Sequence, residues 1–469
     1  MAVISTDANY LAILKDYYRP GLESLLLRDD PMLNKIQKIR YSGEKYVFAA
    51  LAGHGGAVAA DFEVSKANST KTAKNVKFSV GPGQIFSSYT VNSKEVQGTV
   101  NERGAFVQVA VDKMAAATDG FRKMMAACFY GNGYGQIGTV ASGVTFTPNT
   151  AATLTLTSDQ VMKLDVDQKL VVLTALNATT PSVTLVVTNI DEVGNTVTVM
   201  PDGLAAAYTT SATEYLCFAG STDPSGNPIL PSGIFDWLPI KNARSGATWT
   251  AFIGNTFNGV NRSSKPDTLA GSFFYNSSNT TYKADIYGLV KKVRRHCSKA
   301  PLVVVNDNDY EAIMAELDTS NRLLTATDTK SKRSTSIGYS GMSASFSTNF
   351  IEDIVDTPFM PQGAFLVCDP QSWAMVTLTN AEKAKSDVAG NEPGGATVEQ
   401  LADGAKDAKD GPWGICIDDY LSIQSGASTW EGPAAIVAIQ FFGNYVCLNP
   451  AHNGIGLFHN ATPANIIGY

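Results

Sequence analysis

The feature that most constrains this chain is a change of hydrophobic period at the glycine-rich segment 131–138. Before it, apolar residues recur every three to four positions from Asn101, a good helix N-cap, to about Tyr130, which predicts one long amphipathic helix. After it, residues 153–157 and 182–187 alternate polar and apolar side chains with period two, as half-buried strands do. The segment 131–138 therefore predicts a helix exit and a domain boundary.

The predicted helix has one apolar face and one charged face. Its apolar face consists of Phe106, Ala110, Met114, Phe121, Met125 and Cys128. Its opposite face consists of Asp112, Asp119, Arg122 and Lys123. This pattern predicts a helix that packs its apolar stripe on a core and leaves its charged side in solvent.

The composition of the 469 residues allows several folded domains, roughly two to four by size alone. Charged residues make up 17% of the chain, below the roughly 25% usual in soluble domains, so a largely neutral surface is compatible with large contacts between subunits. The net charge of −7 argues against a protein that grips nucleic acid through a basic face. The richest basic stretch, 291–296, is interpreted as a solvated helix face.

Cysteine usage and the N-terminus bear on the compartment. The six cysteines, scattered without a paired spacing, are Cys128, Cys217, Cys297, Cys368, Cys416 and Cys447. Most lie in apolar runs, so we expect buried, reduced thiols in a cytosolic compartment. Residues 1–10 show no secretion signal and no apolar run reaches the length of a membrane span, so we expect neither secretion nor membrane insertion.

Two N-terminal segments lack cores of their own. Residues 1–40 contain two short helix-like stretches, the first broken by Pro20. From Lys45 to Gln97, strand-like ends at 46–48 and 76–91 predict a long two-stranded hairpin, which is marginally stable alone. Both segments therefore need a neighbour to lie on.

The remainder of the chain predicts a mixed fold. Between residues 141 and 222, closely spaced strand and turn signals predict a small β-barrel or sandwich inserted into the chain. Beyond it, the predicted elements are helix 283–297, strand 302–305, helix 309–317, strand 365–368, and closing strands 436–440 and 445–448 around Gly443-Asn444. The predicted fold class is α+β with a β insertion.

Few residues are available for catalysis. The four histidines, none in a metal-ligand or catalytic spacing, are His54, His296, His452 and His459. No nucleophile elbow or phosphate-binding loop occurs, and the glycines of 131–138 follow a helix rather than a strand, which is wrong for a dinucleotide site. The carboxylate pairs 353/356 and 418/419 are interpreted as turn residues. We therefore predict that the chain is not an enzyme and has no catalytic, cofactor-binding or metal site and no cofactor.

The order of the predicted elements resembles that of the major capsid proteins of tailed bacteriophages, which have the Hong Kong 97-type shell fold. That order is an arm, an extended loop, a long spine helix, a β insertion, a helix feeding a strand, and closing strands. Three local stretches are also similar to that family: Phe257–Ser264 with Leu269–Gly271, Val303–Asn306 with Tyr310, and Gly443–Pro450. The resemblance covers nearly the whole chain and depends on the joint order of these parts.

The resemblance implies a division of the chain into segments. These are an N-terminal arm (1–44), an extended loop (45–97), a spine helix of the peripheral domain (98–140), an inserted β domain (141–222), a linker and peripheral domain (223–300), an axial domain (301–435), and closing strands at the peripheral/axial junction (436–469). Some family members cross-link a loop lysine to a neighbouring subunit. Lys66, Lys71 and Lys74 lie in the corresponding loop, and no pattern selects one of them.

The resemblance also implies a function. The chain would be a structural subunit that self-assembles into pentamers and hexamers of an icosahedral head around phage double-stranded DNA. It would be located in the virion capsid after assembly in the host bacterial cytoplasm. Its partners would be many copies of itself, a portal, a decoration protein and, if scaffolding is used, a separate scaffolding protein, because arm and loop leave no room for a fused one. DNA would be enclosed without sequence-specific binding, and no membrane would be involved.

Two alternatives stay open. An encapsulin-like cellular shell has the same fold and is disfavoured by the β insertion. A secreted or surface β-rich protein that binds or hydrolyses carbohydrate would carry a secretion signal and clustered aromatic or acidic residues, and the sequence shows neither plainly.

Overall fold

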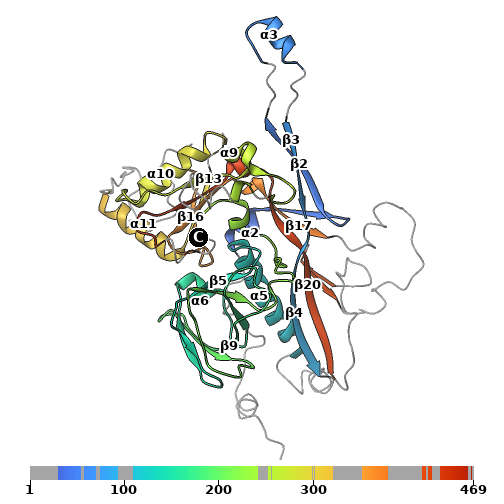
Figure 1. The fold of residues 1–469 in the computed structure, drawn as a ribbon, viewed down its shortest axis with the longest axis vertical. Coiled ribbons are helices and arrows are strands. Elements are labelled where there is room, and N and C mark those ends of the chain that lie inside the picture. The colour runs from blue at the N-terminus through green and yellow to red at the C-terminus, as the bar shows by residue number, and fades with distance from the viewer. Residues whose placement is uncertain are drawn as a thin grey trace, which may run out of the picture. The chain divides into compact units, whose positions relative to one another are not determined.

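The computed structural model in Figure 1 describes residues 30–53, 58–69, 74–92, 109–240, 252–254, 256–297, 299, 301–320, 351–378, 415–418, 421–424, 434–462 and 466. These residues belong to two compact units. Unit 1 draws on Phe86–Lys123 and Glu382–Phe441, and unit 2 draws on Asp29–Ile85, Met124–Ala381 and Phe442–Tyr469. The predicted helical stretches before residue 30, the predicted helix start at Asn101, and His54 lie outside the described residues.

The predicted long helix is present as α5 (Val109–Phe129), and it ends directly before the glycine-rich segment. Phe121 and Met125 of its predicted apolar face are buried. The prediction that Asp119 faces solvent is wrong, because this residue is only 6% exposed. Residues 125–130 are buried without interruption, so the last turn is covered on all sides and a single apolar stripe does not describe it.

The glycine-rich segment 131–138 is a tightly packed connection into strand β5 (Gln136–Val140). Gly135 has a φ of +63°, in the left-handed region that glycine adopts without strain. At Gly138 a Cβ would lie 2.7 Å from the side-chain Oε1 of Gln160, so a larger residue requires this side chain to move. Close packing accounts for these glycines. Because β5 belongs to the β sheet that follows, this sheet begins before the predicted boundary at 141.

Residues 136–218, called the β block here, contain an antiparallel six-stranded sheet in the order β5-β12-β8-β9-β10-β7. Its elements after β5 are β6 (Thr145–Phe146), β7 (Ala152–Thr155), α6 (Ser158–Met162), β8 (Lys169–Leu173), β9 (Val183–Asp191), β10 (Thr196–Pro201), β11 (Tyr208–Thr209) and β12 (Glu214–Phe218). Strands β6 and β11 pair with each other. Alternate side chains such as Leu185, Val197 and Leu216 form one buried cluster, so the period-two prediction is confirmed.

The predicted N-terminal hairpin is present as a two-stranded ribbon. It consists of β2 (Tyr46–Gly53) and β3 (Lys74–Val80), with the short helix α3 (Phe62–Ala67) between them in sequence. Figure 1 shows the ribbon running away from the rest of unit 2, with α3 beyond its end. The prediction of one strand over 76–91 is wrong. Pro82 has no N–H to continue the ladder, and the chain leaves the ribbon there to form β4 (Gly83–Asn92), which pairs with β20.

A mixed parallel and antiparallel sheet lies beside two helices. Its strands, in spatial order, are β13 (Ser272–Phe274), β21 (Gly454–Leu457), β16 (Ala364–Cys368), β14 (Leu302–Val305) and β15 (Ile354–Asp356). Helices α10 (Tyr282–Val293) and α11 (Asp307–Ser320) share one buried cluster with it. The predicted helices and buried strands of this region are therefore confirmed. Strand β13 lies before the boundary predicted at residue 301 and the other four strands lie after it, so one sheet contains segments from both sides of this boundary.

Strand β20 (Ala434–Cys447) runs through both units. In unit 2 it pairs with β17 (Trp373–Leu378), and β17 in turn pairs in parallel with β1 (Gln37–Tyr41). In unit 1 it pairs with β19 (Leu421–Gln424), and β19 in turn pairs with β18 (Ile415–Asp418). The predicted turn at Gly443-Asn444 is wrong, because both residues lie inside this strand. The Asn444 side chain accepts a hydrogen bond from the Ser232 N–H at 2.7 Å and donates one to the Gly81 carbonyl at 2.9 Å. These two hydrogen bonds satisfy the side-chain amide of Asn444, so this residue does not need the local hydrogen bonds of a turn.

The described part of the predicted arm packs within its own unit. Asp30 caps helix α2 (Pro31–Lys35), and its carboxylate also accepts hydrogen bonds from Tyr130 at 3.1 Å and Thr357 at 2.8 Å. Burial raises the pKa of Asp30 above its ordinary value. From Asp30 onward, the segment predicted as an arm over 1–44 is thus part of the subunit's own fold.

Short helices complete the architecture: α7 (Ile234–Trp237), η1 (Arg262–Ser264), α9 (Pro266–Leu269), η2 (Pro370–Ser372) and η4 (Pro450–His452). The fold class is α+β, as predicted. Among the described residues, no helix combines the length and the apolar composition that a membrane crossing requires.

Candidate assembly surface

The inner face of the β2–β3 ribbon is fixed by aromatic side chains. Phe48 and Phe78 are partners in the register, and their rings stack with centroids 5.1 Å apart. Trp237 of α7 packs against Phe78 at 5.6 Å, and Phe257 meets Trp237 edge to face at 5.0 Å. The base of the ribbon is thereby anchored to the body of unit 2.

A buried arginine supports this aromatic cluster. The Arg262 guanidinium lies 3.9 Å from the Phe252 ring centroid and 4.5 Å from that of Phe257. It donates hydrogen bonds to the backbone carbonyls of Asp236 and Trp237, each at 3.2 Å. Burial lowers the pKa of Arg262 to about 10 and raises that of the Asp236 carboxyl to about 6. The Arg262 guanidinium therefore stabilises the base of the ribbon, and its buried position does not suit binding of an anionic partner.

Five large apolar side chains on β2, just before α3 and on α3 are exposed. On β2, Val47 and Leu51 are 45% and 50% exposed. Before and on α3, exposure reaches 93% at Val58, 75% at Phe62 and 49% at Val64, and no residue of the helix is buried. These five residues are called the ribbon patch.

The ribbon patch holds half of the ten large hydrophobic side chains that are exposed in the described part of the chain. Single exposed hydrophobic residues are common on any protein, whereas several within one short segment of the chain indicate a surface that another molecule covers. A two-stranded ribbon is also only marginally stable in water. The arrangement therefore suits docking of the ribbon on another folded surface.

The predicted structural histidines have separate surroundings. His296 is exposed just after α10, and His54 lies outside the described residues. His459 has its ring Nδ1 2.8 Å from the buried carboxylate of Asp285, and its backbone N–H donates to the same oxygen at 2.9 Å. His452 lies at the end of η4, beside an acidic side chain that is described below.

The cysteines that the structure describes are buried, as expected, and one of the three loop lysines is described. The buried, free cysteines are Cys128, Cys217, Cys297, Cys368 and Cys447. Burial raises the pKa of Cys128 to about 12, which keeps this thiol protonated and unreactive. Lys66 is exposed on α3. The side chains of Cys416, Lys71 and Lys74 lie outside the described residues.

A buried ion pair in the β block was not anticipated from sequence. Lys163 lies 3.3 Å from Asp159, one helical turn apart, with both side chains almost fully buried. Burial lowers the pKa of Lys163, and the Asp159 carboxylate opposes that shift. The pair faces α11, where burial raises the pKa of Asp309 to about 7 and the Gly363 N–H donates to its carboxylate at 2.6 Å. The four-residue spacing of Asp159 and Lys163 was the one available signal, and it is common on solvated helices.

A second cluster brings together Cys297, Asp369 and His452 from three distant segments. No sequence spacing connects them, so motif reading missed it. The carboxylates considered in the sequence form no such group: Asp353 accepts from the Ile354 N–H, and Asp356 is exposed. The side chains at 418 and 419 lie outside the described residues.

Comparison with known proteins finds similar solved structures of shells. The chain is similar to a protein of the cyanophage A-1(L) capsid over 97% of both chains, with 11% identity and a TM-score of 0.48. It is similar to a capsid protein of the native GTA particle over 98% of this chain and 99% of that chain, with 8% identity and a TM-score of 0.45. A third is the SrpI encapsulin of Synechococcus elongatus PCC 7942, over 98% and 96%, with 8% identity and a TM-score of 0.39. No family model matches the sequence, and no match was found among curated proteins. Phage capsid proteins are the class that the order of predicted elements resembles.

Proposed function

We propose that this chain is the major capsid protein of a tailed bacteriophage, a structural subunit without enzymatic activity. The observation that carries the proposal is the ribbon patch on an element that has no core of its own. Val58 and Phe62 are 93% and 75% exposed, and nothing described in the subunit covers them. Burying such side chains on a neighbouring copy contributes roughly 1.5–3 kcal/mol for each large residue, which favours association over a monomer.

One contact of this kind, repeated from copy to copy, builds rings. The ribbon is a projecting part and its docking surface lies elsewhere on the subunit, so the contact is heterologous and closes into a ring when the rotation allows it. Rings of five and six copies would form the pentamers and hexamers of an icosahedral head. The extended loop of the resemblance (45–97) would supply this contact through β2, α3 and β3.

The head would enclose double-stranded DNA without reading its sequence. A net charge of −7 suits a wall that confines DNA and does not bind it tightly. The chain would belong to the virion capsid and assemble in the host bacterial cytoplasm. Its partners would be a portal, a decoration protein and a separate scaffolding protein. The β block, with its own core, would be the inserted domain on the outside of the shell, with a start moved from 141 to Gln136.

Assembly of the purified chain tests the proposal, with size-exclusion chromatography and negative-stain microscopy as readouts. We expect rings, tubes or shells from the unaltered protein. The double variant Val58→Ser/Phe62→Ser should stay folded and soluble and should assemble about tenfold or more less well, because roughly 1.4 kcal/mol corresponds to a factor of ten. Val193→Ser is a matched control, because Val193 is 96% exposed but lies in the β block.

A stable monomer would contradict the proposal, and so would a double variant that assembles like the unaltered chain. Shells isolated from infected or expressing cells would be treated with nuclease and their contents analysed. Protected double-stranded DNA supports a phage head, whereas packaged protein without DNA would favour the encapsulin-like alternative.

A further inference from the structure

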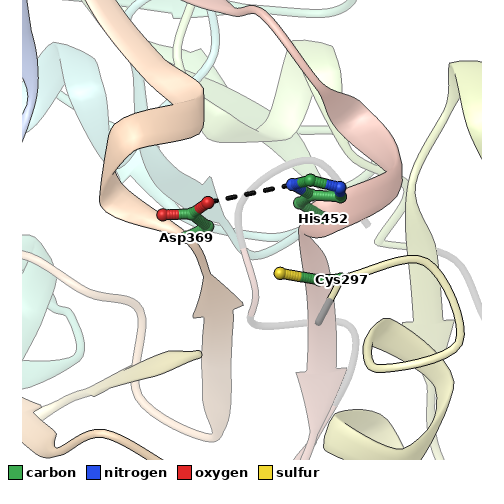
Figure 2. Close-up of side chains that lie close together, drawn as sticks. All are labelled: Cys297, Asp369 and His452. Atoms are coloured by element: carbon green, nitrogen blue, oxygen red, sulfur yellow. Dashed lines mark ion pairs between the residues drawn. The ribbon is translucent and has the colours of Figure 1, made fainter. Parts of the chain in front are cut away.

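Three side chains with metal-binding chemistry meet at the end of the mixed sheet. Cys297 follows α10, Asp369 lies between β16 and η2, and His452 ends η4 just before β21. Figure 2 shows the three groups pointing toward one another, and one ligand atom of each lies within 4.8 Å of the other two. In tetrahedral zinc sites, the usual bond lengths separate such ligand atoms by about 3.3–3.6 Å. Small side-chain rotations would therefore bring all three onto one ion.

Existing hydrogen bonds leave one side-chain atom of Asp369 and one of His452 directed at the space between the three groups. Asp369 uses Oδ1 to accept the Gln371 N–H at 3.1 Å, while its Oδ2 lies 3.8 Å from His452 Nδ1, beyond hydrogen-bond distance. The other ring nitrogen, Nε2, lies 3.0 Å from the side-chain nitrogen Nδ2 of Asn449. A flip of this amide exchanges its nitrogen and oxygen, so that the oxygen accepts from Nε2–H and Nδ1 carries the lone pair that a metal ion requires.

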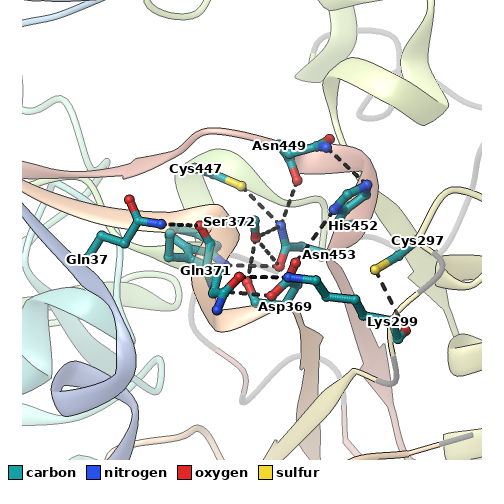
Figure 3. Close-up of polar contacts among 11 residues, drawn as sticks. Gln37, Cys297, Lys299, Asp369, Gln371, Ser372, Cys447, Asn449, His452 and Asn453 are labelled. Atoms are coloured by element: carbon teal, nitrogen blue, oxygen red, sulfur yellow. Dashed lines mark hydrogen bonds and ion pairs between the residues drawn. The ribbon is translucent and has the colours of Figure 1, made fainter. Parts of the chain in front are cut away.

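Further hydrogen bonds hold the contributing segments in place (Figure 3). On the histidine side, the Asn453 carbonyl oxygen Oδ1 accepts from Ser372 Oγ at 3.1 Å and from the Trp373 indole at 3.0 Å. On the cysteine side, Lys299 Nζ donates to Gln371 Oε1 at 2.6 Å. These contacts connect η2 with both other segments. Ligands supported in this way keep their orientation before the ion arrives.

A catalytic cysteine–histidine pair does not fit the same residues. The Cys297 thiol donates to the Lys299 carbonyl at 3.7 Å, and within the described structure neither nitrogen of His452 forms a hydrogen bond with the sulfur. A nucleophilic thiol needs that contact to lose its proton. Cys297 is 2% exposed, whereas the side chains of Asp369 and His452 are 12% and 28% exposed. A small ion can enter from the histidine side, while a substrate could not reach the sulfur.

We propose that Cys297, Asp369 and His452 bind a divalent zinc-class ion, with Sγ, Oδ2 and Nδ1 as ligands and water in the fourth position. A mixed sulfur, nitrogen and oxygen set suits Zn²⁺ or Co²⁺ and not the hard ions Mg²⁺ and Ca²⁺. On binding, the Cys297 thiol gives up its proton to solvent and its hydrogen bond to the carbonyl. The resulting thiolate and the carboxylate balance the two positive charges of the ion. The ion links α10, η2 and η4 and stabilises the folded subunit.

Cobalt(II) titration of the full-length, reduced protein tests this site, because thiolate-to-cobalt charge-transfer absorption reports a Cys ligand directly. We expect saturation near one equivalent and loss of the absorption when Zn²⁺ is added. Cys297→Ser should lose the charge-transfer absorption. Asn449→Ala should keep it but bind roughly 10- to 100-fold more weakly, since the supporting contact to Nε2 is removed. Cys217→Ser, which alters another fully buried thiol, is the matched control and should titrate like the unaltered chain.

Zn²⁺ should also raise the thermal unfolding midpoint of the unaltered chain and of Cys217→Ser, and not that of Cys297→Ser. The proposal is overturned if the unaltered protein shows no charge-transfer absorption with Co²⁺, a result that needs no variant to fold. It is equally overturned if a folded Cys297→Ser or Cys297→Ala variant keeps the absorption. Neither outcome depends on whether the chain assembles into shells.

Discussion

The β block and the β2–β3 ribbon are both antiparallel and both alternate their side chains, yet they bury them differently. In the β block, Leu185 and Leu216 are fully buried in a cluster to which strands across the sheet contribute. In the ribbon, Phe78 on the inner face is buried, while Leu51 on the outer face is 50% exposed. Two strands offer too little surface to cover both of their faces. Alternation of side chains thus predicts a strand. The number of neighbouring strands decides whether the apolar side chains of that strand are buried within the subunit or need another molecule to bury them.

Leu216→Ala should have the largest effect on the subunit. It removes a fully buried side chain from β12, an interior strand of the six-stranded sheet, and leaves a cavity. We expect a loss of about 2–5 kcal/mol in the free energy of unfolding, measured by urea denaturation of the unassembled subunit. A loss below about 1 kcal/mol would contradict the view that the β block has a tightly packed core of its own.

Asp309→Asn tests the contact between the β block and α11. Burial raises the pKa of Asp309 to about 7, and the Asp159 carboxylate adds to the shift. The folded state therefore holds this proton more tightly than the unfolded chain. The stability from this group is complete at low pH and is lost as pH rises from about 4 through about 7.

Asparagine at position 309 cannot ionise but can still accept a hydrogen bond from the Gly363 N–H. The free energy of unfolding of the variant should therefore exceed that of the unaltered chain by roughly 2–4 kcal/mol near pH 8. Below about pH 4 the difference should nearly vanish. Urea denaturation at several pH values measures both. An identical pH dependence in the two proteins would mean that Asp309 is ionised throughout and that its surroundings are more polar than the structure indicates.

Gly138→Ala tests the packed entry into the β block. The new Cβ would lie 2.7 Å from Gln160 Oε1, so the neighbouring side chain must move, at an expected cost of about 1–3 kcal/mol in unfolding free energy. Gly120→Ala is the control, because Gly120 lies in α5 with no atom near its added Cβ and should be neutral or stabilised by up to about 1 kcal/mol. Equal stability of both variants would contradict the view that close packing requires glycine at position 138.

Leu51→Ala is the same chemical change as Leu216→Ala, placed on the ribbon, and should have the smallest effect on the isolated subunit. We expect a change within about 0.5 kcal/mol in unfolding free energy, because half of the side chain is already exposed. Light scattering should nevertheless detect a several-fold higher protein concentration for assembly. A large loss of subunit stability, or unchanged assembly, would remove the distinction between the two regions.

Local sequence patterns predicted elements well where the relevant neighbours are close in the chain. Helix α5, the strands of the β block and the ribbon strands follow directly from their periods. Errors occurred where a distant contact overrides the local signal. Asn444 resembles a turn residue, but its amide is satisfied by Ser232 and Gly81, so β20 continues through it. Asp119 belongs to the predicted charged face of the helix, but it is buried.

The two clusters with unusual chemistry show the same limit. The buried pair of Asp159 and Lys163 has an ordinary helical spacing, and only its burial makes it unusual. Cys297, Asp369 and His452 are each isolated in the sequence and meet because β16 and β21 pair and α10 packs against them. Spacing rules detect ligands that one element carries, and they miss ligands that three elements bring together.

By itself, the sequence determined the α+β class, the switch from helix to strands at the glycine-rich segment, and the presence of an N-terminal ribbon without a core. These properties depend on periodicity and on the conformational preferences of glycine and proline, which act over a few residues. The tertiary structure alone decided which ribbon face is open, that the glycine-rich segment is closely packed, and that three distant side chains converge. Burial depends on which elements pack together, and that packing is set by contacts between residues far apart in the chain.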